Sequence, residues 1–259
     1  MKRILHILLW ALVIAYLAWT SRLACHKAGA ALCKDIRIEI TDSSRLTLLS
    51  TEELKTRLLT PDGTRLIGEP MASLSLRSIE TRMETHPAVR KAEAFTTFDG
   101  TLHLEVSQRI PVLRIFNSRG EDFYLDEDGC AIQPATLHAA DVPVASGSIP
   151  VPFAQVAGRS ILEEGHGGTE LQTLYQIALY LRSHDFWNAQ IQEINILDNG
   201  DIRFIPRVGP PILFGPWQQV SEKFDHLLTF YRKALNTMGW QRYRQISVKY
   251  QGQIIGIKK

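Results

Sequence analysis

The sequence lacks the features that mark nucleic-acid-binding and disulfide-stabilised proteins. Its formal net charge is only +2 and it has no long run of like charges, whereas nucleic-acid binding normally needs a concentrated basic face. Its 3 cysteines in 259 residues are an odd and sparse set, without a Cys-x-x-Cys pair that would suggest zinc. Low-complexity tracts are absent, and 45% hydrophobic with 22% charged residues is the composition of an ordinary folded protein.

Enzyme motifs are also absent. The sequence has no His-Glu-x-x-His, no Gly-x-Ser-x-Gly and no Walker or dinucleotide glycine spacing. Cys130 and His138 are close in sequence, but nothing orients them as nucleophile and base, so a structural cysteine is the better interpretation. The stretch 126–129 begins like a calcium loop but predicts a turn, and the glycines of 165–168 predict a flexible loop. We therefore expect no enzyme activity, no metal and no cofactor.

One long apolar run stands at the N-terminus. Residues 4–20 contain one strongly polar side chain, His6, and a helix over residues 4–19 is roughly 24 Å long against a hydrocarbon core of ~30 Å. Because this helix is apolar on all sides, it predicts a membrane span rather than a globular helix. A cleaved signal peptide is the alternative, although Arg22 occupies a position where a lipoprotein cleavage box needs an aliphatic residue.

The flanks of this run are short. Residues 1–3 form a tail too small to be a domain, and residues 21–34 show no periodicity and predict a linker. Positive residues stand on both sides of the run, so charge alone does not fix its orientation. If the following chain is exported, Cys25 and Cys33 could form a disulfide, and two unpaired thiols are equally consistent with the sequence.

Residues 35–109 predict a small α+β module. The expected order is strand, helix, helix, strand, strand, from the alternation and helical spacing of apolar residues. The first helix follows Ser50, the second begins near Ser75 and ends before Pro87, and Asp99-Gly100 predicts the tight turn of a hairpin. Two helices on one face of a three-stranded sheet would bury its apolar side.

Residues 110–259 predict a mixed, β-rich domain with two helices. The helices are expected over about 169–183 and 218–238. Asp198-Asn199-Gly200-Asp201 predicts a hairpin turn, and the prolines after residue 205 indicate that the next strand is short or lies at an edge. The expected strands are 112–116, 122–125, 191–197, 202–205, 245–250 and 254–257.

Several fragments, in this order, resemble the bacterial division protein family FtsQ, called DivIB in some lineages. The fragments are His86–Ala92, Gly100–Val106, Arg109–Val112, Tyr124–Gly129, Val151–Gly158, Ile212–Gly215 and Lys223-Phe224. Together they extend over nearly the whole chain. Gln108 departs from the pattern, because the family commonly has glutamate there.

The resemblance implies a function. It implies a short cytoplasmic tail, a single span, a POTRA domain and a β domain outside the inner membrane at the division septum. It also implies a scaffold that links early and late division proteins, with the FtsB/FtsL coiled-coil pair as principal partners. Two rivals remain: a transport or assembly factor containing a POTRA domain, which would need a many-stranded barrel behind it, and an exported cell-wall enzyme, which would need a nucleophile or metal triad.

The resemblance also implies a binding site. In the family, an FtsB segment pairs with the last strand of the β domain, and here residues 246–250 match the pattern of that strand, with Lys249 where arginine is common and Ser247 where aspartate is. This stretch is therefore predicted to be a free edge that receives a partner strand. From the residues alone, Tyr250 could instead be a core tyrosine. The predicted site residues are Ile246, Val248, Lys249, Tyr250, Gly252 and Ile254.

Overall fold

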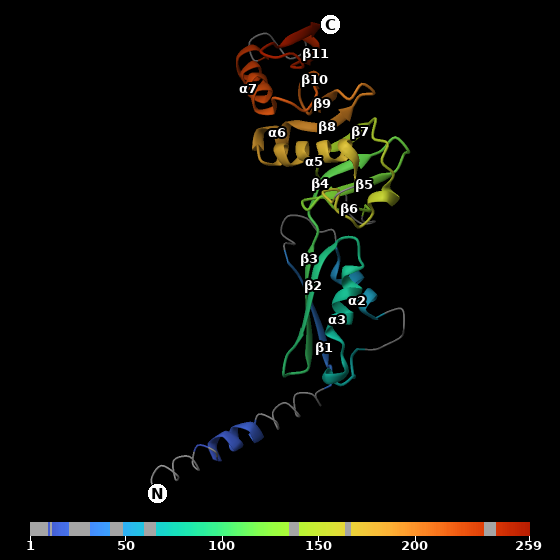
Figure 1. Ribbon diagram of the computed structural model, residues 1–259, viewed down its shortest axis with the longest axis vertical. Helices are drawn as coiled ribbons and strands as arrows, with labels where there is room; N and C mark the ends of the chain where they lie inside the picture. Colours follow the sequence, from blue (N-terminus) through green and yellow to red (C-terminus); the bar gives the residue numbers. More distant parts are fainter. Residues whose placement is uncertain are drawn as a thin grey trace. The chain divides into compact units, whose positions relative to one another are not determined.

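The computed structural model describes residues 10, 12–20, 32–41, 49–59, 66–134, 140–163, 167–235 and 242–259. The chain divides into two compact units, Met1–Gln108 and Arg109–Lys259 (Figure 1). Each unit has its own hydrophobic core. Both combine helices with a sheet, as the predicted α+β class requires.

The first unit has the predicted order of strand, helix, helix, strand, strand. Its elements are β1 (Asp35–Thr41), α2 (Thr51–Leu59), the short 3-10 helix η1 (Met71–Ser73), α3 (Leu76–Glu84), β2 (Val89–Thr96) and β3 (Thr101–Gln108). The sheet order is β1-β3-β2, with β1 parallel and β2 antiparallel to the central strand. Ser75 caps α3 by accepting a hydrogen bond from the Ser78 amide.

The core of the first unit lies between the two helices and one face of this sheet (Figure 1). Leu54 of α2 and Met83 of α3 are fully buried, as are Leu102, Leu104 and Val106 at alternate positions of β3. This period of two gives the central strand one apolar face and one polar face. The predicted two-layer module is confirmed.

The described residues of the second unit form one mixed sheet of nine strands, in the order β12-β11-β10-β9-β8-β7-β4-β5-β6. The strands are β4 (Pro111–Phe116), β5 (Asp122–Asp126), β6 (Ala131–Ile132), β7 (Val144–Gly147), β8 (Ile191–Ile196), β9 (Ile202–Pro206), β10 (Ile212–Gly215), β11 (Tyr243–Ser247) and β12 (Ile255–Lys258). The helices are α4 (Phe153–Val156), α5 (Gly168–Arg182), α6 (Asp185–Gln190), α7 (Val220–Phe230) and its π-helical continuation η2 (Tyr231–Leu235).

The two predicted helices, α5 and α7, are crossover connections. Strands β7 and β8 pair in parallel, as do β10 and β11, and parallel neighbours need a long connection between them. Helix α5 lies in the first of these connections and α7 in the second. The short helices α4 and α6 and the strands β6 and β7 were not predicted, because each has too few residues to show a period.

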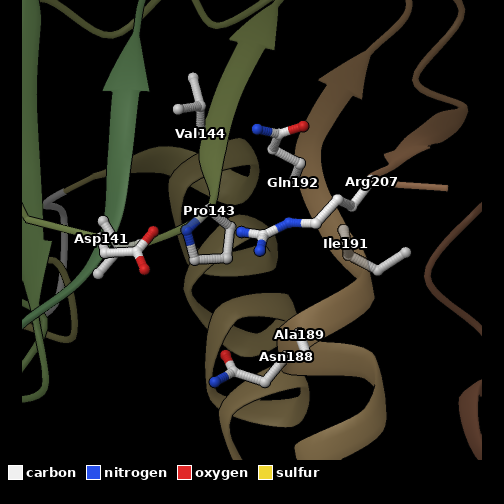
Figure 2. A pocket seen from close by; sticks show the side chains of 9 residues that line it. Asp141, Pro143, Val144, Asn188, Ala189, Ile191, Gln192 and Arg207 are labelled. Atoms are coloured by element: carbon white, nitrogen blue, oxygen red, sulfur yellow. The ribbon is translucent and has the colours of Figure 1, made fainter.

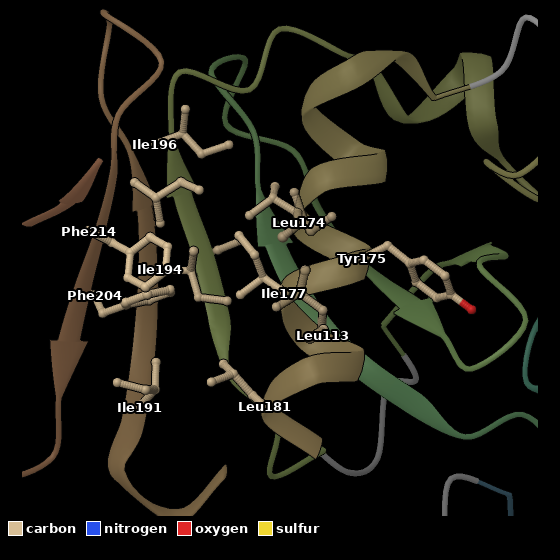
Figure 3. Close-up of a cluster of buried hydrophobic side chains, with 14 of the residues drawn as sticks. Leu113, Leu174, Tyr175, Ile177, Leu181, Ile191, Ile194, Ile196, Phe204 and Phe214 are labelled. Carbon is tan, nitrogen blue, oxygen red and sulfur yellow. The ribbon is translucent and has the colours of Figure 1, made fainter. Parts of the chain in front are cut away.

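The core of the second unit is shown in Figure 3. Leu174, Ile177 and Leu181 of α5 point toward the strands, and all three are fully buried. On the strand side, the rings of Phe204 and Phe214 lie 5.2 Å apart between centroids. Burying one such side chain stabilises the fold by about 1.5–3 kcal/mol. Helices therefore cover one face of the sheet and leave the other face open to solvent in part.

Part of the N-terminal prediction lies outside the described residues. Residues 12–20 are helical, and Leu12, Ile14 and Trp19 are exposed there. In the described part of the chain, no helix is long and apolar enough to cross a membrane, and the span over residues 4–20 stays a prediction. Cys33 is buried with a free thiol. Cys25, His138, Gly165 and His166, on which other predictions rest, lie outside the described residues.

Candidate partner-binding site

The acidic turn after β5 is a structural feature. Asp126 is 1% exposed, and its Oδ2 lies 2.7 Å from Nη1 of Arg109. Its Oδ1 accepts hydrogen bonds from the amides of Asp128 and Cys130. Burial raises the pKa of the Cys130 thiol, which disfavours the nucleophilic thiolate. Among the residues that the structure describes, no group of three or more His, Cys, Asp or Glu could hold a metal ion.

A hollow of about 330 Å³ lies where β7 and β8 begin (Figure 2). Its charged side chains are Asp141 and Arg207, and Arg207 extends across it (Figure 2). Asn188 and Gln192 add two amides. The described lining has no cysteine, serine or histidine that could act as nucleophile or base, so it lacks the groups of an acyl-transfer site.

In the part of the chain that the structure describes, the strand edges are the remaining candidates, and two of the four edges are closed. The β2 edge is covered by α3, because Glu80 accepts a hydrogen bond from the Ala94 amide at 2.9 Å and Glu84 accepts one from Ala92 at 3.3 Å. The β6 edge is covered by residues 157–161, since Ala131 donates its amide hydrogen bond to the Arg159 carbonyl. Closing an edge in these ways prevents pairing with another chain.

The two open edges, β1 and β12, differ in chemistry. Along β1 the exposed residues are Asp35, Arg37, Glu39 and Thr41. Three of these four are charged, and charged residues on an edge oppose strand pairing. On β12, Ile255 and Ile257 are 41% and 38% exposed. In the described part of the sheet, β12 is the last strand and has no neighbour on its outer side. This edge is the better docking surface for an extended segment.

The direction of the free backbone groups on β12 follows from the pairing of β11. The amide of Ile246 donates to the Pro211 carbonyl, so its backbone groups point toward β10. Its partner in register is Gly256. Opposite residues in an antiparallel pair either exchange both hydrogen bonds or none. The amide and carbonyl of Gly256 therefore point away from β11, and by alternation so do those of Lys258.

The predicted edge strand was placed one strand too early. Residues 246–250 are not a free edge, because β11 pairs with β10 on one side and with β12 on the other. Ile246 and Val248 are 0% and 2% exposed and belong to the core. Their side chains cannot contact a partner. The strand predicted over 254–257 is β12, and its residues Ile255, Gly256, Ile257 and Lys258 form the outer edge.

Lys249 stabilises the turn that leads to β12. Its Nζ lies 2.7 Å from Oδ2 of Asp201, in the turn between β8 and β9. The hydrogen bond to Asp201 raises the pKa of Lys249. Its stem lies across Gly215, where an added Cβ would be 2.7 Å from Cγ of Lys249. Lys249 thus ties three segments together and is a positioning residue for the edge.

The other predicted site residues lie in the turn and at the start of the last strand. Tyr250 is 57% exposed, so the alternative of a core tyrosine is wrong. Gly252 has a φ of +66°, which permits the turn of the chain toward β12. Ile254 is partly buried against the core. Tyr250 and Gly252 therefore precede the free edge strand in the chain but are not part of it.

Lys223 supports the neighbouring strand from α7. Its Nζ donates to the carbonyls of Phe214 and Pro216, both at 3.1 Å, and lies 4.6 Å from the Phe214 ring centroid. Burial lowers the pKa of this lysine, and the charge of Asp201 opposes that effect. The lysine thus fixes the end of β10. Strand β11 pairs with β10, and β12 pairs with β11.

Comparison with known proteins agrees with this architecture. The family model described as "FtsQ/DivIB, C-terminal related" matches residues 110–256, and a POTRA-like domain model matches residues 31–107. A curated relative, the cell division protein FtsQ of Geotalea daltonii, is 28% identical over 236 residues, which cover 90% of this chain and 78% of that protein. The two matched regions correspond to the two compact units.

Proposed function

We propose that this chain, which belongs to the FtsQ/DivIB family of cell-division proteins, is a non-enzymatic scaffold of the division machinery. It holds other division proteins at the septum by protein–protein binding and links early to late components. Its principal partners are coiled-coil proteins of the FtsB/FtsL type. The described residues contain no catalytic constellation. This is compatible with a scaffold role, but the proposal rests on the strand edge described below.

The scaffold is anchored in the inner membrane. Residues 4–20 form the span and residues 1–3 the cytoplasmic tail. The POTRA-like region from residue 35 to 109 and the β domain after it lie outside the cytoplasm. The support is the long apolar run of the sequence and the exposed apolar side chains of the described helix at 12–20. This arrangement places the partner-binding edge where other anchored division proteins can reach it.

The outer edge of β12 carries the proposal. A partner segment adds as a further strand and pairs with the outward backbone groups of Gly256 and Lys258. Main-chain hydrogen bonds supply affinity in this mode, and alternate side chains supply specificity. Ile255 and Ile257 give the added strand an apolar surface on the open face of the sheet.

Lys258→Pro tests this mode. Proline removes the outward amide donor at position 258, and an edge strand tolerates proline where its amide faces solvent. We expect binding of a purified FtsB-type partner to weaken by at least about tenfold, or about 1.4 kcal/mol, in a titration of the full-length protein. Lys258→Ala is the matched control, because it removes the side chain and keeps the amide.

Two outcomes decide the matter. If Lys258→Pro is folded by circular dichroism and binds as tightly as the parent, strand addition at this edge is wrong. If the alanine and proline variants weaken binding equally, the lysine side chain, and not the backbone, makes the contact.

A further inference from the structure

Among the residues that the structure describes, three large hydrophobic side chains are exposed at one end of the first unit. Phe98, at the tip of the hairpin between β2 and β3, is 92% exposed, and Ile67 and Leu32 are 52% and 50% exposed. Single exposed apolar residues are common on protein surfaces and need no explanation. Three of them at the same end, on three different segments, form an apolar tip.

The segments of this tip are fixed to one another by backbone hydrogen bonds. The Lys34 amide donates to the Gly100 carbonyl, and the Gly68 amide donates to the Cys33 carbonyl, both at 2.7 Å. At Gly100 an added Cβ would lie 2.7 Å from the Leu32 carbonyl oxygen, so the hairpin and the entering chain are in close contact. The apolar tip is therefore a built surface and not three independent loops.

The same end receives the chain from the N-terminal apolar segment. Asp35, the first residue of β1, is in register with Thr101, the first residue of β3. The start of β1 and the tip of the hairpin therefore lie at one end of the sheet (Figure 1). The apolar helix is described to Thr20, and the twelve steps from there to Leu32 extend to at most about 40 Å. If the helix is anchored, Leu32 stays within about 40 Å of the end of that helix, so the tip can reach the membrane surface.

We propose that the apolar tip of Leu32, Ile67 and Phe98 rests on the lipid bilayer, with the Phe98 ring at the boundary between head groups and acyl chains. This inference rests on the anchor of the proposed function and adds a second membrane contact to it. Beside Phe98, Asp99 is exposed, and its carboxylate accepts hydrogen bonds from the Thr97 hydroxyl and from the Thr101 amide. These bonds hold the carboxylate against the hairpin.

Phenylalanine and leucine side chains of interfacial segments enter the boundary between the head groups and the acyl chains of a bilayer. Lys34, exposed beside the tip, is placed to meet lipid phosphate. An interfacial contact of this size is weak by itself. The membrane anchor raises the effective concentration of the apolar tip at the bilayer surface and so favours the contact. The two contacts together hold the first unit in one orientation on the membrane.

Photo-crosslinking of the full chain tests the proposal. p-Benzoylphenylalanine is placed at position 98, and at the exposed position 90 near the other end of β2 as a control. Each protein is reconstituted in nanodiscs of phosphatidylethanolamine and phosphatidylglycerol, irradiated, and analysed by intact mass. We expect at least roughly tenfold more lipid adduct at position 98 than at position 90. Leu32→Ser with Ile67→Ser should reduce the adduct at position 98.

Four results overturn the proposal. They are equal adduct at positions 98 and 90, no lipid adduct at position 98, a crosslink from position 98 to a second copy of the chain instead of lipid, and no co-elution with nanodiscs. The last would refute the anchor as well, and size-exclusion chromatography separates that case from the others. Circular dichroism confirms folding, which these exposed substitutions should not change.

Discussion

The ring of Tyr243 lies over Gly256, across the pair of strands that ends the sheet. A Cβ built on Gly256 would be 2.5 Å from Cε1 of Tyr243, so no residue other than glycine fits while the ring stays in place. The ring of Tyr243 also packs edge-on against the ring of Phe230 in α7, with 6.2 Å between centroids. The edge strand β12 is therefore held by a ring packed over a glycine, in addition to its hydrogen bonds to β11.

Gly256→Val should weaken partner binding by displacing β12. The added side chain collides with Tyr243, and overpacking of this kind costs about 1–3 kcal/mol. Thermal unfolding and a binding titration measure the two effects. Gly256→Val combined with Tyr243→Ala removes the collision, and we expect this double variant to bind better than Gly256→Val alone. Equal binding by both would show that the ring does not position the strand.

Periodic signals predicted most of the elements. More buried and more exposed residues alternate along β1 and β3 of the first unit. Helix α3 begins after Ser75 and ends before Pro87, as the sequence predicted. The hairpin of β8 and β9 turns at Asn199-Gly200, as the sequence predicted. These features are determined by residues that are close together in the sequence, and such local patterns can be recognised in a single sequence.

The position of the free edge could not be predicted from the same signals. The sequence shows strands near 245–250 and 254–257 but not which strand lies outside. That order depends on α7, whose crossover places β11 parallel to β10 and leaves the hairpin partner β12 on the outer side. The ion pair of Lys249 with Asp201 joins residues 48 positions apart, which no local pattern reveals.

Arg109→Ala should destabilise the second unit strongly. It leaves the buried carboxylate of Asp126 without its cation, and breaking a buried pair costs about 3–5 kcal/mol. Arg114→Ala is the comparison, because its partner Asp122 is 27% exposed and an accessible pair contributes at most about 1 kcal/mol. Chemical denaturation of both variants measures the difference. A smaller loss for Arg109→Ala than for Arg114→Ala would contradict this interpretation.

Lys223 should make stability depend on pH in the alkaline range. Its folded pKa lies below its ordinary value of 10.5, so between these two values the unfolded state binds more protons than the folded state. Stability therefore rises with pH across that window. Lys249 has a raised pKa, so its stabilising contribution is present below 10.5 and is lost at higher pH.

Lys223→Met tests the role of this lysine. The variant should lack the alkaline rise in stability. It also leaves the carbonyls of Phe214 and Pro216 without their donor, which we expect to cost about 1–3 kcal/mol at neutral pH. Denaturation at several pH values measures both effects, with Lys259→Met as an exposed control. An unchanged pH profile in Lys223→Met would show that another group is responsible.

Leu9→Arg with Val13→Arg should prevent membrane insertion of the N-terminal segment. Each arginine near the centre of a span costs about 3 kcal/mol on insertion scales, and an apolar run of this length has no surplus hydrophobic residues to offset two of them. Carbonate extraction of membranes is the measurement. Leu162→Arg with Val208→Arg is the matched control, because both residues are exposed in the second unit and the same charge is added away from the span. A double variant at positions 9 and 13 that still resists extraction would place the anchor elsewhere, and the orientation argued for the apolar tip would lose its basis.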